Sequence, residues 1–247
     1  MTVVPKISVI TITYNAKDFI EATLQNVINQ SYLNIEYVVI DGASNDGTLE
    51  IIERYKEKID ILVTEPDKGI YDAMNKGINN ATGDYIIFMN AGDEFFDLQT
   101  IEKAFTNHNN EDFVYGDTVM VGKNGQERDW YKKKPKQDVI SYRSFINGMV
   151  ICHQSMFIKR SIALPYRLDL KISADIDWCV RCLKQAKTFR DSGIVIAKFL
   201  DGGLSQTKRQ KAWKERFTIL KQHFGLLPTL WQHGLILINA IKRGKIG

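Results

Sequence analysis

The first part of the chain alternates between short apolar runs and polar turns. Four apolar runs, at residues 7–12, 35–40, 61–64 and 85–89, have the length and composition of strands buried on both faces of a sheet. Apolar residues at helical spacing follow the first three runs, in the first case at Ile20, Leu24, Val27 and Ile28. This order of strand, turn and helix predicts an α/β fold with a mostly parallel central sheet flanked by helices.

The turns after these runs share a composition rich in Asp, Asn, Ser and Gly. Because the carboxyl ends of parallel strands lie along one edge of a sheet, we expect Asp41, Asp67 and Asp93 to converge there. Glycines in the same turns allow close backbone approach, and the helix N-termini that follow offer free N–H groups to an anion. The pattern predicts a site for a phosphorylated ligand, although Ser44 and Asp46 also suit plain helix caps.

The most informative stretch is residues 84–96, whose apolar first half ends abruptly in Asn90, Gly92, Asp93 and Glu94. A polar cluster at the carboxyl end of a buried strand is where open α/β sheets bind ligands. A small acidic turn can hold a hard divalent cation together with phosphate oxygens. A solvated turn that only ends the strand is the alternative.

The second half of the chain is less regular. Short strands are expected at residues 114–117 and 155–158. Residues 118–130 predict a small β-hairpin insertion, because Asn124-Gly125 favours a type I′ turn.

Two carboxylates mark the start of a helix expected to run to about Lys187. Asp175 and Asp177 both suit the positive end of a helix dipole. A carboxylate that faces a cleft can instead take a proton from a hydroxyl as a general base. Since the two side chains point in different directions on a helix, we expect only one of them to face the cleft.

From Thr207 onward the chain is strongly basic. Nine Lys and Arg residues stand against one acid, Glu215, so this segment carries +8 in a chain whose total is +4. An apolar stripe runs along it at Trp213, Phe217, Leu220 and Phe224, and a second apolar stretch follows at residues 230–241. A basic amphipathic helix with aromatic residues is typical of a peripheral membrane anchor. The alternative is packing on the rest of the chain or in a homodimer. Nucleic acid is not an expected partner, since no known reader module accompanies the basic patch.

Length and composition indicate an ordinary globular protein. The chain has 247 residues, 44% hydrophobic and 25% charged, which suits one α/β domain with an appendage. No export signal or spanning apolar run is recognised, so a cytoplasmic location is expected, with peripheral contact to the cytoplasmic face of the membrane as an option. Cys152, Cys179 and Cys182 are expected to be reduced, and Cys179 and Cys182, although they match C-x-x-C, are expected to pack in the core rather than serve a redox or zinc site.

Five segments taken together resemble the family-2 glycosyltransferases, inverting enzymes of the GT-A (Rossmann-like) fold, and in particular small bacterial members that build surface polysaccharides such as lipopolysaccharide. The segments are residues 9–16, 39–48, 67–77, 83–93 and 173–177. The resemblance implies a catalytic domain at 1–205, with a nucleotide-sugar-binding half at 1–97 and an acceptor-binding half at 98–205. Basic amphipathic helices at 206–247 would follow it.

The resemblance also implies roles for the matching residues of the donor half. Thr13 and Asn15 would line the nucleotide pocket, and Asp41 would read the base, usually uracil. The remaining donor contacts would be Asp67 and Lys68 beside the nucleotide and Asp72 in the sugar pocket.

The catalytic centre that the resemblance implies combines both halves. The segment 90–93 matches the Asp-x-Asp region, so Asp93 would bind Mn²⁺ or Mg²⁺ that bridges the donor diphosphate, with Asn90 beside it. Asp175 occupies the place of the catalytic base. His153 and Gln154 would lie near the transferred sugar or the acceptor.

Two positions depart from the family pattern. Asn90 replaces the first acid of Asp-x-Asp, so the metal would rest on one carboxylate, diphosphate oxygens and water, and should bind poorly without donor. Gly42 replaces the second Asp of the usual Asp-Asp-Gly-Ser turn, which leaves the donor base open.

The resemblance implies transfer of a sugar, with inversion, from a nucleotide-diphosphate sugar such as a UDP-sugar to a glycan or lipid-diphosphate-linked acceptor. A sugar-phosphate nucleotidyltransferase is one rival, but it would need a glycine-rich, arginine-bearing loop where residues 13–16 stand. A catalytically silent partner in polysaccharide assembly is the other rival, and Asn90 keeps it open.

Overall fold

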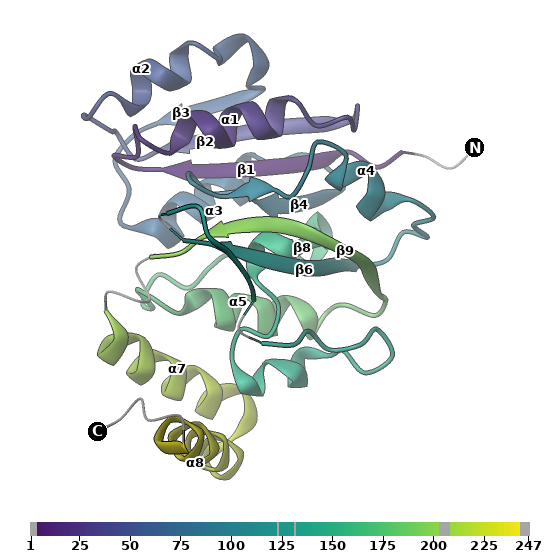
Figure 1. Cartoon of the computed structure of the whole chain (residues 1–247), viewed down its shortest axis with the longest axis vertical. Helices are drawn as coiled ribbons and strands as arrows, with labels where there is room; N and C mark the ends of the chain where they lie inside the picture. Colours follow the sequence, from purple (N-terminus) through teal and green to yellow (C-terminus); the bar gives the residue numbers. More distant parts are fainter. Residues whose placement is uncertain (1–3, 123, 131, 203–207, 243–247) are drawn as a thin grey trace.

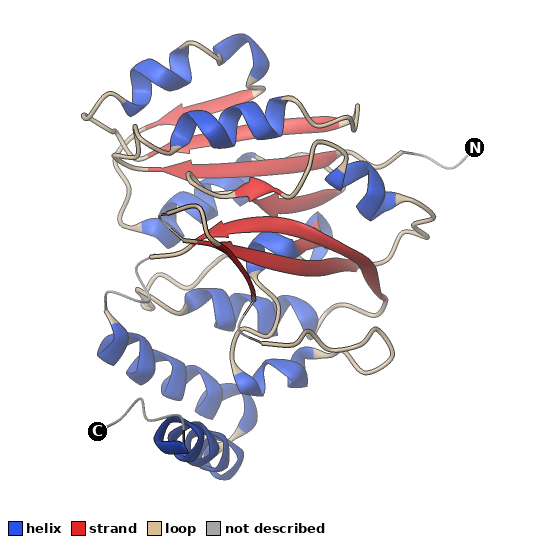
Figure 2. Ribbon diagram, in the orientation of Figure 1, coloured by secondary structure: helices blue, strands red, loops and turns tan. Residues whose placement is uncertain are grey.

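A curled central sheet with flanking helices forms the body of the protein in a computed structural model that describes residues 4–122, 124–130, 132–202 and 208–242 (Figures 1 and 2). The strands run in the order β3-β2-β1-β4-β8-β6-β9-β5, and β7 pairs with β6. The predicted domain boundary between 205 and 206, and the basic residues Arg243 and Lys245, lie outside the described residues.

The first four strands lie where the apolar runs predict them. They are β1 (Ile7–Thr13), β2 (Ile35–Asp41), β3 (Ile61–Thr64) and β4 (Tyr85–Phe88). Their pairings with one another are all parallel, and the register sets Thr13 beside Asp41 and Asp41 beside Thr64. The connecting helices are α1 (Ile20–Ile28), α2 (Thr48–Glu53) and α3 (Ile70–Asn80). The predicted parallel half with its single carboxyl edge is therefore confirmed.

The second half extends the same sheet with mixed pairings. β6 (Phe113–Val121) and β7 (Glu127–Asp129) form the predicted hairpin, with a positive φ of 76° at Gly125. β8 (Met156–Lys159) lies antiparallel between β4 and β6. A short helix, α4 (Thr100–Phe105), precedes β6.

Two strands are absent from the sequence prediction. β5 (Glu94–Phe95) is a two-residue strand, and β9 (Phe189–Leu200) runs for 12 residues between β6 and β5. The polar residues Arg190, Asp191 and Ser192 interrupt the start of β9, and most of the strand is only half-buried. The apolar run at 194–197 marks only its middle, so the full strand was missed.

The helix that carries Asp175 is shorter than predicted. α5 (Ala174–Leu183) ends four residues before Lys187, so the predicted end was wrong. The backbone N–H groups of Lys187 and Thr188 donate to the carboxylate of Asp112 instead of continuing the helix. This contact turns the chain from α5 into β9.

The basic C-terminal segment forms two helices, α7 (Arg209–Phe224) and α8 (Leu226–Lys242), on the side of α5 away from β3 (Figure 1). α7 packs on α5, and its Ile219 and Leu220 are fully buried. Trp213 of the predicted stripe is 40% exposed. One face of α7 therefore packs on the rest of the chain, which was the alternative to a membrane anchor. Among the described helices, none has the length and apolar character of a membrane span.

The cores on the two faces of the sheet are closed by apolar side chains from both halves of the chain. Cys152, Cys179 and Cys182 are buried free thiols, and Cys179 and Cys182 belong to one of these cores, as the sequence predicts. Burial of this kind supplies most of the favourable free energy of folding.

One buried carboxylate joins strands at the amino edge of the sheet. Glu36 of β2 is 4% exposed and accepts hydrogen bonds from the Lys6 ammonium, the Ser8 hydroxyl and the backbone N–H of Thr82. Burial alone would raise the pKa of Glu36, but these hydrogen bonds outweigh it and lower the pKa to about 2.

We predict that Glu36→Gln lowers the free energy of unfolding by about 2 kcal/mol at pH 7, because charge-assisted bonds are lost. Since the folded pKa is depressed, the wild-type advantage should be complete above the ordinary pKa of 4.5 and vanish as the pH falls towards 2. Urea unfolding at several pH values measures both effects. Glu53→Gln, at a 46% exposed side chain, is the control and should change stability little. An equal loss in both variants would contradict the account.

Candidate functional site

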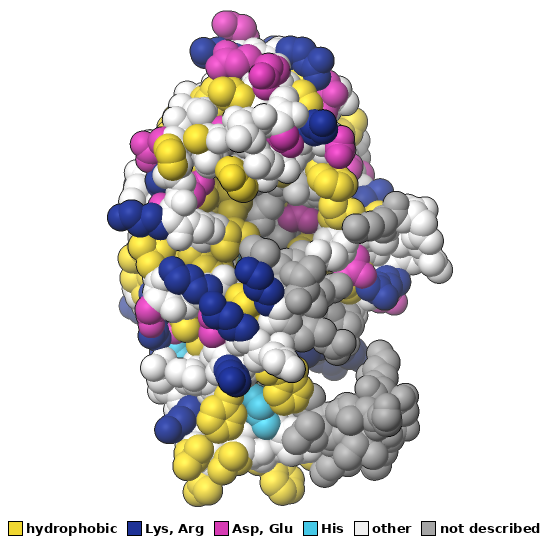
Figure 3. Space-filling view, turned by 90° about the vertical axis from the view of Figure 1, so that its left-hand side faces the viewer, with side chains coloured by type: hydrophobic (Ala, Val, Ile, Leu, Met, Phe, Trp, Pro, Cys, Tyr) yellow, Lys and Arg dark blue, Asp and Glu magenta, His cyan; other side chains and the backbone are white. Residues whose placement is uncertain are grey.

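A cavity of about 630 Å³ opens at the carboxyl edge of the sheet. Figure 3 views the molecule from the side to which the arrowheads of β1 and β2 point in Figure 1. Five of the residues proposed from the sequence line this cavity, namely Asn90, Asp93, His153, Gln154 and Asp175. The structure thus brings together side chains from the turn after β4, the turn before β8 and the start of α5.

The turn that carries Asn90 and Asp93 is held by α1. The Thr23 hydroxyl donates to the carbonyl of Asp93 at 2.9 Å and accepts the N–H of Gly92 at 2.9 Å. Gly92 has a φ of +98°, which a residue with a Cβ adopts only at a cost. Sequence analysis did not single out Thr23, because it sits among the buried residues of an ordinary amphipathic helix.

The Asp93 carboxylate is 4% exposed and anchored from two sides. The Gln154 amide donates to one oxygen at 2.7 Å, and the backbone N–H of Leu200, at the end of β9, donates to the other at 3.0 Å. Burial raises the pKa of Asp93 to about 7. Gln154, whose own oxygen accepts from the Cys152 thiol at 2.7 Å, therefore orients Asp93.

Four buried polar atoms at this edge have no hydrogen-bond partner among the described residues. They are Asn90 Oδ1, His153 Nε2, Thr13 Oγ1 and Asp41 Oδ1. Burial also lowers the pKa of His153 to about 4, so the imidazole is neutral near pH 7. Buried polar groups without partners cost folding free energy, so their concentration here points to a polar ligand.

The end of β1 and the turn after β2 form one rim of the edge. The backbone N–H of Asn15 donates to the Ser44 hydroxyl, and the Asn15 side-chain oxygen accepts from the N–H of Asn45. Asp41 accepts from the N–H of Ser44 with one oxygen and keeps the other unpaired. Asn15 and Ala43 have φ angles of 49° and 61°, a strained conformation that clusters at functional sites.

Gly42 departs from the family pattern for a steric reason. A Cβ at this position would lie 2.7 Å from a carboxylate oxygen of Asp67 and 3.2 Å from the Tyr14 ring. No larger side chain fits unless these neighbours shift. Neither Ser44 nor Asp46 is the N-cap of α2, which is Gly47, but the Asp46 carboxylate accepts from the backbone N–H of Thr48, the first residue of that helix, at 3.0 Å.

Asp67, Lys68 and Asp72 lie at the start of α3, outside the cavity lining. Asp67 pairs with the Lys76 ammonium at 2.7 Å, while Asp72 accepts the backbone N–H of Lys68 at 2.9 Å. Tyr71, rather than Asp72, lines the cavity from this helix. The expected place of Asp72 in a sugar pocket therefore has no support from the geometry.

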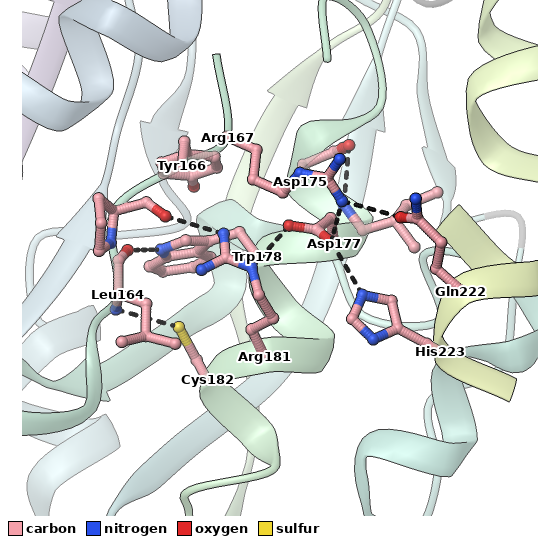
Figure 4. Close-up of polar contacts among 12 residues, drawn as sticks. Leu164, Tyr166, Arg167, Asp175, Asp177, Trp178, Arg181, Cys182, Gln222 and His223 are labelled. Carbon is pink, nitrogen blue, oxygen red and sulfur yellow. Dashed lines mark hydrogen bonds and ion pairs between the residues drawn. The ribbon is translucent and has the colours of Figure 1, made fainter. Parts of the chain in front are cut away.

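The two carboxylates of α5 face opposite ways, as the helical spacing predicts. Asp175 lines the cavity, and burial raises its pKa to about 6. Asp177 is fully buried away from it and binds Arg181 at 2.6 Å and His223 of α7 at 2.8 Å (Figure 4). Burial would raise the pKa of Asp177, but these partners hold it below its usual range.

Part of the cavity lining is an apolar wall formed by Met120, Trp130, Met149 and Phe199. Trp130 and Phe199 meet edge to face with ring centroids 5.8 Å apart, and Met120 and Met149 lie in the same lining. Lys171, just before α5, adds a cationic side chain. These residues were missed from the sequence, since β9 was not predicted and no motif covers the hairpin.

Known proteins resemble this chain in sequence and in fold. A family model described as Glycosyl transferase family 2 matches residues 8–164. The Mycobacterium bovis (strain BCG / Pasteur 1173P2) protein named PGL/p-HBAD biosynthesis glycosyltransferase is 31% identical over 223 residues, covering 86% of this chain and 84% of that protein. The Bacillus subtilis (strain 168) protein named Putative teichuronic acid biosynthesis glycosyltransferase TuaG is 26% identical over 253 residues, covering 97% of each.

Solved structures share the fold. S. aureus TarS 1-349 in complex with UDP-GlcNAc superposes with a TM-score of 0.68 at 19% identity, covering 88% of this chain and 71% of that chain. The mannosyltransferase PcManGT from Pyrobaculum calidifontis, in complex with GDP-Man and Mn²⁺, gives 0.59 at 21% identity, covering 90% and 64%. Because the family model spans more than half of the sequence and the sheet has the GT-A arrangement, the chain belongs to glycosyl transferase family 2.

Proposed function

We propose that this glycosyltransferase moves a sugar from a UDP-sugar to a hydroxyl of a glycan or lipid-linked acceptor, with inversion, in polysaccharide or glycolipid biosynthesis. The observation that carries the proposal is the single cavity shared by Asp175 and the turn of Asn90 and Asp93. The names of the mycobacterial and Bacillus relatives support the biosynthetic setting.

The unpaired atoms at the edge suit a UDP-sugar donor. Asp41 offers a free carboxylate oxygen at the end of β2, which can accept the N3–H of uracil. Thr13 offers a hydroxyl beside it, in register on β1. The UDP-GlcNAc complex of TarS supports the same donor class.

The side chains present can hold a divalent cation only when the nucleotide-sugar donor is also bound. Asp93 supplies a carboxylate. Asn90 Oδ1 and His153 Nε2, which have no hydrogen-bond partner among the described residues, are further atoms in the same lining that could bind a metal. Among the described residues there is no group of three His, Cys, Asp or Glu side chains that could hold a metal alone. Mn²⁺ or Mg²⁺ would neutralise the diphosphate leaving group, and diphosphate oxygens would complete its coordination.

Asp175 suits the role of general base. With a pKa of about 6 it is mostly ionised at neutral pH and still basic enough to accept a proton. It would take the proton of the acceptor hydroxyl as that oxygen attacks the anomeric carbon opposite the diphosphate. One displacement of this kind inverts the configuration and needs no covalent enzyme intermediate.

The apolar wall supports an acceptor that carries an apolar group. Trp130, Phe199 and Met149 would receive this group, and Lys171 suits a phosphate next to it. A lipid-diphosphate-linked sugar combines both features. A free oligosaccharide would use the aromatic faces but not the remaining apolar surface.

The exposed apolar residues of α8 support peripheral contact with the cytoplasmic face of a membrane. Leu227 is 79% exposed and Trp231 70% exposed, next to the basic helix α7. An apolar face with Trp and neighbouring cations favours the interface of an anionic bilayer.

We predict that Asp175→Asn lowers turnover by about 10²–10⁴-fold, because the amide cannot accept the proton. UDP release from UDP-sugars measures turnover, and calorimetry with UDP should give an unchanged Kd. In the wild type, turnover should fall below about pH 6 as Asp175 is protonated. Asp169→Asn, at a 64% exposed position, is the control. Full activity in Asp175→Asn would overturn the assignment.

A thermal-shift panel tests donor class and metal together. UDP with Mn²⁺ should raise the melting temperature clearly, because a ligand that binds only the folded state stabilises it. Mn²⁺ alone should give little shift. Stabilisation by nucleoside triphosphates and not by UDP would favour a nucleotidyltransferase. UDP binding without any UDP-sugar turnover would favour the silent assembly partner.

Flotation with anionic vesicles tests the membrane contact. The intact protein should float with vesicles, and the double change Leu227→Ser and Trp231→Ser should weaken binding at least about tenfold, since two buried apolar side chains are lost. Leu33→Ser, at a 98% exposed leucine in the donor half, should bind like the wild type. Absence of vesicle binding by the intact protein would exclude this contact.

A further inference from the structure

The backbone that leads into the helix of Asp175 is held by side chains from other elements. The N-cap residue of α5, Ser173, makes no side-chain capping bond. The N–H of Lys171 donates to one carboxylate oxygen of Glu215 at 3.0 Å, and those of Ile172 and Ser173 donate to the other at 2.8 and 3.0 Å. The next N–H, of Ala174, donates to the Tyr71 hydroxyl at 3.1 Å.

Glu215 lies on α7, far along the chain from the loop that it binds. It is the single acid among nine Lys and Arg residues from Thr207 onward, and it lies outside the segment matched by the family model. A carboxylate that accepts three consecutive N–H groups makes charge-assisted bonds, which are stronger than neutral ones. Its charge also lies at the N-terminus of α5, where the helix dipole favours it.

A second contact fixes α7 against α5. His223, near the end of α7, lies 2.8 Å from the fully buried carboxylate of Asp177, and Gln222 beside it accepts from Arg167 (Figure 4). α7 is therefore attached at two points separated by about two helical turns. The Glu215 contact acts on the loop that lines the cavity, whereas the His223 contact acts on the buried face of α5.

We propose that Glu215 is a positioning residue for sugar transfer, which holds backbone 171–174 so that Asp175 and Lys171 face the cavity. The proposal rests on the proposed role of Asp175 as the base. A displacement of about 1 Å at a reacting group can cost up to about 10²-fold in rate, so a contact that sets this backbone can control turnover without touching substrate.

The charge of Glu215 supplies a readout that a purely structural contact would not move. Burial is the largest cause of the raised pKa of Asp175, and the like charge of Glu215 raises it further. The other titratable side chains in the cavity lining are Tyr71, Asp93, Cys152, His153, Lys171 and Asp201. Removing the Glu215 charge while these stay in place should lower the pKa of the base and shift the acidic limb of the turnover profile to lower pH.

The experiment compares Glu215→Gln with Lys214→Gln, its exposed neighbour on the same helix. Turnover is measured as UDP release from the UDP-sugar that the wild type cleaves fastest, from pH 5 to 8. Glu215→Gln should lower kcat by about 10–10²-fold, with a shifted acidic limb and an unchanged Kd for UDP. Lys214→Gln should keep the wild-type kcat and profile.

A folded Glu215→Gln with wild-type kcat and acidic limb would overturn the proposal, even if its melting temperature fell. If this variant does not fold, Glu215→Asp takes its place, since it keeps the charge but is too short to reach all three N–H groups. It should lower kcat without moving the acidic limb, and wild-type kcat would overturn the proposal. Full activity of Asp175→Asn would instead refute the proposed base, and thereby the catalytic role of Asp175 itself.

Discussion

Several backbone N–H groups at the carboxyl edge find no partner within their own turn, and this constraint organises the site. Buried N–H groups need partners, so side chains from neighbouring elements supply them. Thr23 pairs the N–H of Gly92, Ser44 pairs that of Asn15, and the Asp93 carboxylate pairs that of Leu200. Tyr71 and Glu215 do the same ahead of Asp175.

This pairing separates side chains that build the site from side chains left for a ligand. Asp72 and Asp177 lie in motifs typical of functional residues, but both carboxylates already have partners. Asp72 accepts from the backbone N–H of Lys68, and Asp177 binds Arg181 and His223. Asn90 Oδ1, His153 Nε2, Thr13 Oγ1 and Asp41 Oδ1 stay unpaired although buried. These four unpaired atoms lie along one edge, where a donor with a base, a diphosphate and a sugar needs several contacts at once.

Much of the donor half can be predicted from the sequence, because burial on both faces gives each strand a continuous apolar run. Residues 7–12 are an instance, since they lie within β1, whose seven residues are all buried. The edge of a parallel sheet then brings Asn90, Asp93 and Asp41 into one region. Helical spacing says only that Asp175 and Asp177 diverge, so the choice of Asp175 comes from the resemblance to family-2 enzymes and not from the local pattern.

The rest depends on contacts between segments distant in sequence. β9 alternates too weakly to be recognised, yet Leu200 at its end fixes Asp93. The lone acid in the basic segment, Glu215, was a visible signal, but nothing local indicates that its partners are the N–H groups of residues 171–173. Trp130 follows β7 and Phe199 lies in β9, and they meet because both strands pair with β6. The apolar wall therefore has no sequence motif.

The most direct test of the central claim is a crystal structure of the protein with UDP and Mn²⁺. The account predicts uracil against Asp41 and Thr13, with the diphosphate and cation between Asn90, Asp93 and His153 and with Asp175 open to the acceptor side. A nucleotide bound elsewhere, with these four buried polar atoms still unpaired, would contradict it.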